Sequence, residues 1–184
     1  MKLAKNLENL GTENAFAVLA EAKKLEAQGK SMIHMGLGQP DFKTPKHVVE
    51  AAKKALDDGH HGYVMSNGIP ECRQSVTRKI KKLYNVDIDF ERILIMPGGK
   101  PTMSYAIQCF GEPGAEIIHP TPAFPIYESM INYTGSTSVP YDLTEDKDLK
   151  FNPEKILSLI TEKTRLLILI NPNNPTGSFV EKAD

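Results

Sequence analysis

The sequence contains only two cysteines, Cys72 and Cys109, among its 184 residues. They are too few for a disulfide framework and too far apart in the chain for a metal-binding knuckle. The five histidines also lack the spacing of metal ligands, so we predict no metal site. Cys109 lies in the largely apolar run 106–110, and we interpret it as a buried thiol.

No apolar run is long enough to span a membrane, and the N-terminus lacks the apolar segment and cleavage site of a secretory signal. A formal net charge of −1 gives no bias toward nucleic acid or anionic lipid. We therefore expect a cytoplasmic protein that binds neither nucleic acid nor membrane. One cluster of cations has no aromatic platform beside it and is interpreted as a solvated helix face: Arg73, Arg78, Lys79, Lys81 and Lys82.

Apolar residues recur at helical spacing or in short continuous runs, and glycine and proline separate these segments. Helices are predicted at residues 12–29, 45–59, from 70 onward, and at 100–110, 125–133 and 153–161. Strands are predicted at residues 32–35, 93–96, 116–119, 136–141 and 165–170. Alternating strands and helices predict an α/β fold with helices around a mostly parallel sheet. The continuous run 166–170 indicates a strand that is buried on both faces.

The loop after that strand reads Asn171-Pro172-Asn173-Asn174-Pro175-Thr176-Gly177. In open parallel sheets, ligands bind at the loops that leave the carboxyl ends of the strands. Three asparagines there would present amide donors and acceptors to a ligand. A polar turn is the alternative, because asparagine, proline and glycine are ordinary turn residues.

Two further loops follow predicted strands. Gly98-Gly99-Lys100 precedes a helix, where backbone N–H groups can hold an anion, although the spacing is neither that of a P-loop nor that of a dinucleotide fingerprint. A tight structural turn is the alternative. In the stretch 120–127, Phe124 could stack on a flat ligand or be a core aromatic. Together the three loops suit a flat, phosphorylated aromatic cofactor.

These loops and two earlier stretches resemble the class I/II aminotransferases, pyridoxal-phosphate enzymes of the aspartate aminotransferase superfamily with fold type I. The similarity runs from about residue 14 to the end of the chain. The motifs that carry it are Gly38-Gln39-Pro40-Asp41-Phe42-x-Thr44-Pro45, Tyr63, Gly68-Ile69-Pro70-Glu71-x-Arg73, Gly98-Gly99-Lys100, Phe124-Pro125-x-Tyr127 and Asn171-Pro172-x-Asn174-Pro175-Thr176-Gly177.

The resemblance implies a role for each matching residue. The turn Gly98, Gly99 and Lys100 is similar to the one that holds the phosphate of pyridoxal 5'-phosphate, and Asn174 to the asparagine that binds its phenolic oxygen. Phe124 resembles the aromatic residue stacked on the pyridine ring. Pro101 departs from the pattern because it removes a backbone donor, for which the Thr102 hydroxyl could compensate.

Other roles implied by the resemblance concern the substrate and a partner subunit. Gly38 resembles the glycine whose backbone meets the substrate carboxylate, at a substrate site that would also include Phe124 and Asn174. Tyr63 resembles the tyrosine that reaches the phosphate of the other subunit's cofactor, which implies a homodimer. The substrates would be an amino acid and a 2-oxo acid.

The resemblance also places four functional groups beyond Asp184: the Schiff-base lysine, the aspartate on the pyridine nitrogen, and the arginines for phosphate and substrate carboxylate. We therefore expect no catalytic residue within this chain, and no transaminase activity from it alone. Residues 1–44 are predicted to be an N-terminal arm and the first piece of a small domain, and 45–184 the first half of the cofactor-binding domain. The alternatives are another fold-type-I enzyme, such as a carbon–sulfur lyase, or a non-catalytic binding protein.

Overall fold

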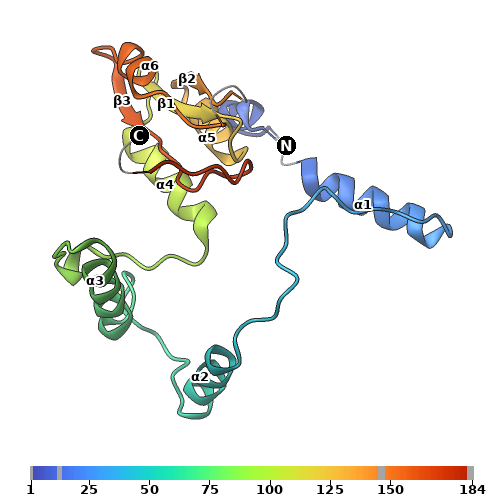
Figure 1. Cartoon of the computed structure of the whole chain (residues 1–184), viewed down its shortest axis with the longest axis vertical. Helices are drawn as coiled ribbons and strands as arrows, with labels where there is room; N and C mark the ends of the chain where they lie inside the picture. Colours follow the sequence, from blue (N-terminus) through green and yellow to red (C-terminus); the bar gives the residue numbers. More distant parts are fainter. Residues whose placement is uncertain (1, 12–13, 145–147, 182–184) are drawn as a thin grey trace. The chain divides into compact units, whose positions relative to one another are not determined.

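The computed structural model describes residues 2–11, 14–144 and 148–181, so the predicted cap at Thr12 lies outside the described residues. The chain forms two compact units (Figure 1). The sheet unit comprises Met1–Ala20 and Gly98–Asp184, and the helical unit comprises Glu21–Pro97. The division predicted at residue 44 concerns the domains of a longer protein, and it stays a prediction.

The sheet unit is built on three parallel strands: β1 (Glu116–Thr121), β2 (Thr137–Asp142) and β3 (Thr164–Leu167), in the order β2-β1-β3. Three helices accompany them: α4 (Gly99–Phe110), α5 (Ile126–Thr134) and α6 (Pro153–Ser158). The predicted parallel α/β arrangement is confirmed.

Two apolar clusters hold the helices against the sheet. Ile117 of β1 packs with residues of α4 and α5, whereas the next residue, Ile118, points to the other face and packs with Ile156 of α6. Successive side chains of a strand point to opposite faces, so this alternation puts α4 and α5 on one side of the sheet and α6 on the other. Both isoleucines are fully buried, which makes β1 the centre of the core.

The prediction that residues 166–170 are buried on both faces is wrong. Leu166 and Ile168 pack into the cluster beside α4 and α5, but Leu167 and Leu169 are 37% and 53% exposed. The regular strand also ends at Leu167. The physical reason is the strand order: β3 lies next to β1 only, and among the described residues α6 covers the β1 and β2 side of that face.

The N-terminal segment belongs to the sheet unit. The short 3-10 helix η1 (Lys5–Asn9) contacts α5. The Gly11 N–H donates to Ser129 Oγ at 3.0 Å, and the same hydroxyl donates to the Gly11 carbonyl at 3.3 Å. The segment from Lys5 to Gly11 is therefore held against α5. It leads toward α1 (Asn14–Ala27).

The helical unit contains α2 (Lys46–Asp57), α3 (Pro70–Tyr84) and the short 3-10 helix η2 (Phe90–Arg92). The predicted strands at 32–35 and 93–96 are wrong, because neither segment pairs with a strand among the described residues. Ile33 and Met35 are almost fully exposed. The Ile95 N–H instead donates to the Asn67 carbonyl at 3.1 Å, an isolated contact with a loop.

Two predictions about single side chains are also wrong. Arg73 is fully buried, although it was assigned to a solvated face. Its Nε donates to the Ile93 carbonyl at 3.0 Å, its Nη2 donates to Glu91 at 2.7 Å, and its guanidinium lies over the Phe90 ring. Cys109 is exposed rather than buried, because Ile107 is the α4 residue that enters the core.

Candidate functional site

Two contacts bring the three predicted loops of the sheet unit together. The Nζ of Lys100, in the first turn of α4, lies 5.4 Å from the centre of the Phe124 ring and 5.5 Å from that of Phe16. The Nδ2 of Asn173 donates to the Pro122 carbonyl at 3.4 Å. The loop before α5 therefore contacts both other loops, and the three form one continuous surface.

The glycine turn leaves open space where a side chain would stand. Gly98 has a φ of 97°, in the region that favours glycine, and a Cβ built there would meet no atom within 4 Å. A Cβ on Gly99 would approach only the Met103 methyl, at 3.6 Å. The backbone N–H groups of Gly98, Gly99 and Lys100 precede the fifth residue of the helix and have no intrahelical acceptor. This cradle suits a phosphate at the positive end of the α4 dipole.

The helix that follows the aromatic loop begins at Ile126, directly after Phe124 and Pro125. Phe124 is half-buried, so one part of its ring is packed and another is accessible. Tyr127, in the first turn of α5, packs against the apolar cluster around Ile117, and burial raises the pKa of its hydroxyl. The ring of Phe124 is therefore held at the edge of the core, where it can stack on a flat ligand.

The three asparagines of the last loop have different environments. Asn171 is exposed and makes two hydrogen bonds with the backbone of Val180, both at 3.0 Å. Its Nδ2 donates to the Val180 carbonyl, and its Oδ1 accepts from the Val180 N–H. Asn174 is exposed, as an amide that meets a ligand must be. Asn173 is only 6% exposed, and its Oδ1 accepts no hydrogen bond from any described residue. Neither the residue pattern nor the family resemblance assigns Asn173 a role of its own.

A buried histidine lies on β1, the strand that leads into the loop of Phe124. His119 of β1 contacts the Pro120 carbonyl through Nδ1 at 3.0 Å and Ser138 Oγ through Nε2 at 2.7 Å. A carbonyl can only accept, so Nδ1 carries the proton and Nε2 accepts from the serine. Burial lowers the pKa of His119, against the opposing effects of the Pro120 contact and the charge of Glu128. His119 is therefore a neutral part of the core.

The other two predicted site residues, Gly38 and Tyr63, belong to the helical unit and are described apart from the three loops. The side chain of Tyr63 is fully exposed, and a Cβ on Gly38 would meet no atom within 4 Å. Both are therefore accessible to a ligand or a partner.

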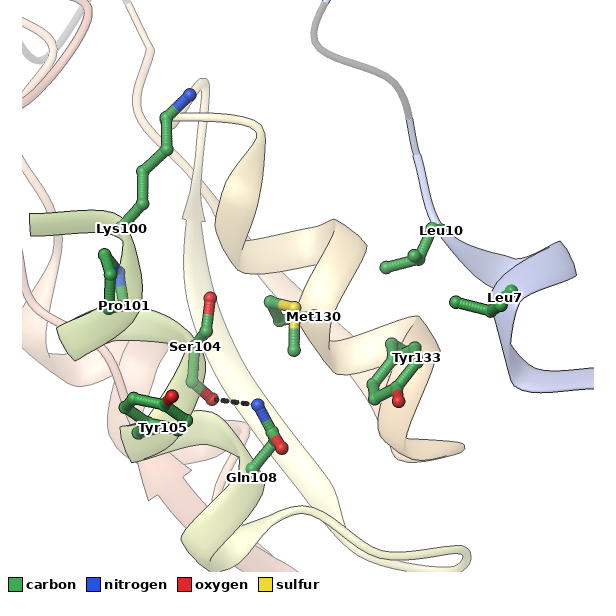
Figure 2. Close-up of a pocket in the computed structure, with 9 residues that line it drawn as sticks. All are labelled: Leu7, Leu10, Lys100, Pro101, Ser104, Tyr105, Gln108, Met130 and Tyr133. Atoms are coloured by element: carbon green, nitrogen blue, oxygen red, sulfur yellow. Dashed lines mark hydrogen bonds between the residues drawn. The ribbon is translucent and has the colours of Figure 1, made fainter. Parts of the chain in front are cut away.

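A hollow of about 480 Å³ lies beside α4 (Figure 2). Its walls are mostly apolar and come from α4, α5 and the N-terminal segment: Leu7, Leu10, Lys100, Pro101, Ser104, Tyr105, Gln108, Met130 and Tyr133. One polar group inside it is already used, because Gln108 donates to the Ser104 carbonyl at 3.3 Å. The convergent polar groups lie in the three loops that contain Lys100, Phe124 and Asn173, which are the better candidate site.

Within residues 2–11, 14–144 and 148–181, no three histidine, cysteine or acidic side chains form a cluster that could hold a metal ion. In the same part of the chain, no helix combines the length and the apolar character needed to cross a membrane.

Comparison with known proteins identifies relatives of the whole chain. Residues 30–184 match the family described as aminotransferase class I and II. The aspartate aminotransferase of Bacillus subtilis is 34% identical over 177 residues, which cover 96% of this chain and 45% of that protein. A probable aspartate aminotransferase of Methanocaldococcus jannaschii is 39% identical over 82% of this chain and 40% of its own length. The chain thus spans about half the length of the curated relatives it matches.

Solved structures agree with the sequence comparison. The aspartate aminotransferase from Thermus thermophilus with maleate superimposes with a TM-score of 0.93 at 31% identity, covering 100% of this chain and 48% of that one. An alanine aminotransferase from Pyrococcus furiosus gives a TM-score of 0.92 at 30% identity, covering 99% and 47%.

Proposed function

The chain belongs to the class I and II aminotransferase family, and from this membership we propose that it is part of a pyridoxal-phosphate-dependent aminotransferase. Such an enzyme transfers an amino group between an amino acid and a 2-oxo acid. The observation that carries the proposal is the contact of the three loops through Lys100, Phe124 and Asn173. They combine an anion cradle, a stacking surface and an exposed amide.

The residues present fit pyridoxal phosphate. When bound, the cofactor withdraws electrons from the α-carbon of the amino acid and so makes the proton on that carbon acidic. The amides of Gly98, Gly99 and Lys100 would hold the phosphate, and the Phe124 ring would stack on the pyridine. The Asn174 amide would donate to the phenolic oxygen and favour its charged form.

We propose one role each for Gly38 and Tyr63 of the helical unit. The backbone of Gly38 would meet the substrate carboxylate, and Tyr63 would serve the cofactor of a second subunit. A homodimer would give the fully exposed Tyr63 ring a partner. Light scattering of the complete enzyme tests this part, which a monomer would contradict.

The cradle is tested by ligand binding with two matched variants. Gly98 and Gly114 both have a φ above 90° and open space at the Cβ position, so alanine strains the backbone at either position without meeting another atom. We expect Gly98→Ala to weaken binding of inorganic phosphate and of pyridoxine 5'-phosphate about tenfold, whereas Gly114→Ala leaves both unchanged. Pyridoxine phosphate has no aldehyde, so it does not react with surface lysines.

A third variant separates the ring from the phosphate. Asn174→Ala removes the proposed contact with the phenolic oxygen, so it should weaken pyridoxine phosphate alone, by roughly fivefold for one hydrogen bond. Calorimetric titration measures all four proteins. If Gly98→Ala binds both ligands like the unmodified chain, the phosphate does not lie in this turn, and the assignment fails.

A further inference from the structure

Asn173 stands between the two Asn-Pro pairs and is the one asparagine of its loop that is buried. We propose that Asn173 is a positioning residue, which couples the loop of Asn174 to the loop of Phe124. Through it, the amide that reads a flat ligand and the ring that stacks on that ligand are held in one arrangement. The part of this inference that concerns a ligand rests on the proposed function, whereas the coupling of the loops does not.

The coupling follows from the orientation of one amide group. Nδ2 of Asn173 donates to the Pro122 carbonyl at 3.4 Å and to Thr176 Oγ1 at 2.9 Å. A carbonyl oxygen can only accept, so turning the amide around would lose the contact with Pro122. The two protons of this NH₂ group therefore join a neighbour within the loop to a residue 51 positions earlier in the chain. Pro122 lies two residues before the Phe124 ring.

The backbone around Asn173 is fixed as well. Its N–H donates to the Ser178 carbonyl and its own carbonyl accepts from the Gly177 N–H, both at 2.8 Å. The hydroxyls of Thr176 and Ser178 lie 2.7 Å apart, and Ser178 also donates to the Leu149 carbonyl at 2.8 Å. Asn174 thus lies in a loop that is closed by hydrogen bonds on both sides of it. A shift of the neighbouring Asn173 side chain would therefore also change the position of Asn174.

Stability alone does not account for this residue. The Nδ2 half of the amide is paired, but the buried Oδ1 has no donor among the described residues. A buried acceptor without a partner is costly, and an apolar side chain of similar volume would remove that cost. An asparagine at this position is better explained by the connection that its NH₂ group makes than by a gain in stability.

Hydrogen exchange of backbone amides tests the coupling. Asn173→Leu keeps the branched shape of the side chain and removes both polar groups. We expect exchange to become about tenfold faster at positions 173 and 177, whose N–H groups bond within the loop, and also at Tyr127, whose N–H donates to the Phe124 carbonyl. The unfolding temperature of the sheet unit should stay the same or rise. Asn171→Ser is the matched control: it breaks the contacts with Val180 and should leave the exchange of Tyr127 unchanged.

A change confined to residues 173–178 would show a local structural role and overturn the proposal. If Asn173→Leu does not fold, Asn173→Asp gives the same test, because it keeps the size and loses the donor toward Pro122. Thr176→Val offers the converse: it should loosen residues 173–178, while the contact with Pro122 leaves the exchange of the Tyr127 N–H unchanged.

Two ligands separate this inference from the proposed function. We expect Asn173→Leu to bind pyridoxine 5'-phosphate about five- to tenfold more weakly and inorganic phosphate unchanged, because only the ring depends on the coupled loops. Equal weakening of both ligands, or of neither, would overturn the positioning role. If the unmodified chain binds neither ligand, the proposed function fails, and the exchange rate of the Tyr127 N–H still decides whether the loops are coupled.

Discussion

Tyr141→Phe is expected to remove an alkaline-sensitive part of the stability of the sheet unit. Tyr141 lies on β2, is 2% exposed, and donates from its hydroxyl to the Ile168 carbonyl at 3.0 Å. Its ring packs edge-on against Phe151, with ring centres 6.4 Å apart. Burial raises the pKa of the hydroxyl from 10.0 to about 12. The bond to Ile168 holds the chain just before the loop that carries Asn173 and Asn174.

The size of the effect follows from that pKa. A shift of two units corresponds to roughly 3 kcal/mol between the folded and unfolded chain. The unfolded chain ionises near pH 10, whereas the folded chain keeps the proton until about pH 12. Because the folded-state pKa is raised, the stability is fully present below pH 10 and is lost as the pH rises from 10 to 12. The phenylalanine variant should lack this loss, and at neutral pH it should cost about 1 kcal/mol for the missing hydrogen bond.

The absorbance of tyrosinate in the near ultraviolet measures the ionisation directly, since the chain has six tyrosines and no tryptophan. We expect a late step near pH 12 in the unmodified chain and none in Tyr141→Phe. Tyr84→Phe, at an exposed position of the helical unit, is the control and must leave the late step in place. If Tyr141→Phe removes absorbance near pH 10 instead, the hydroxyl is not buried and the reasoning is refuted.

Two further predictions concern buried cationic or titratable side chains. Arg73→Lys loses the fork that reaches Ile93 and Glu91, so it should lower the free energy of unfolding of the helical unit by about 2–3 kcal/mol in urea, whereas Arg78→Lys on the exposed face of the same helix should cost less than about 0.5 kcal/mol. For His119, burial lowers the folded-state pKa below 6.5, so the sheet unit should lose stability as the pH falls through 6.5. His119→Gln should flatten that dependence in thermal melts, and an unchanged slope would contradict it.

The sequence alone predicted the sheet unit well, because its elements are marked by local signals. Glycine or proline marks the start of the helices α4, α5 and α6, and the glycines at 114 and 135 precede the short strands β1 and β2. The errors occur where the outcome depends on distant partners. Residues 32–35 and 93–96 have strand-like composition, but a strand needs a neighbour, and residue patterns do not say whether one is present. The exposure of Leu167 and Leu169 likewise depends on strand order.

Single side chains show the same limit within the site. Two of the three loops follow strands, as their sequence position predicts, whereas residues 93–96 form no strand and the glycine turn is marked only by its place before α4. The burial of Arg73 cannot be predicted from helical spacing, which does not show that the later segment with Glu91 and Ile93 folds back against the helix. Asn173 could not be distinguished from Asn171 and Asn174, since only the fold determines which of three adjacent amides points inward.

The contact between Gly11 and Ser129 joins positions 118 residues apart. During synthesis the N-terminal segment leaves the ribosome first, while its docking surface on α5 does not yet exist. At about 5–20 residues per second, the missing stretch takes roughly 6–24 s to make. The helical unit is translated in this interval, as an insertion between the two parts of the sheet unit. The apolar side chains of η1 and Leu10 are therefore available to chaperones or to premature contacts for seconds before Ser129 emerges.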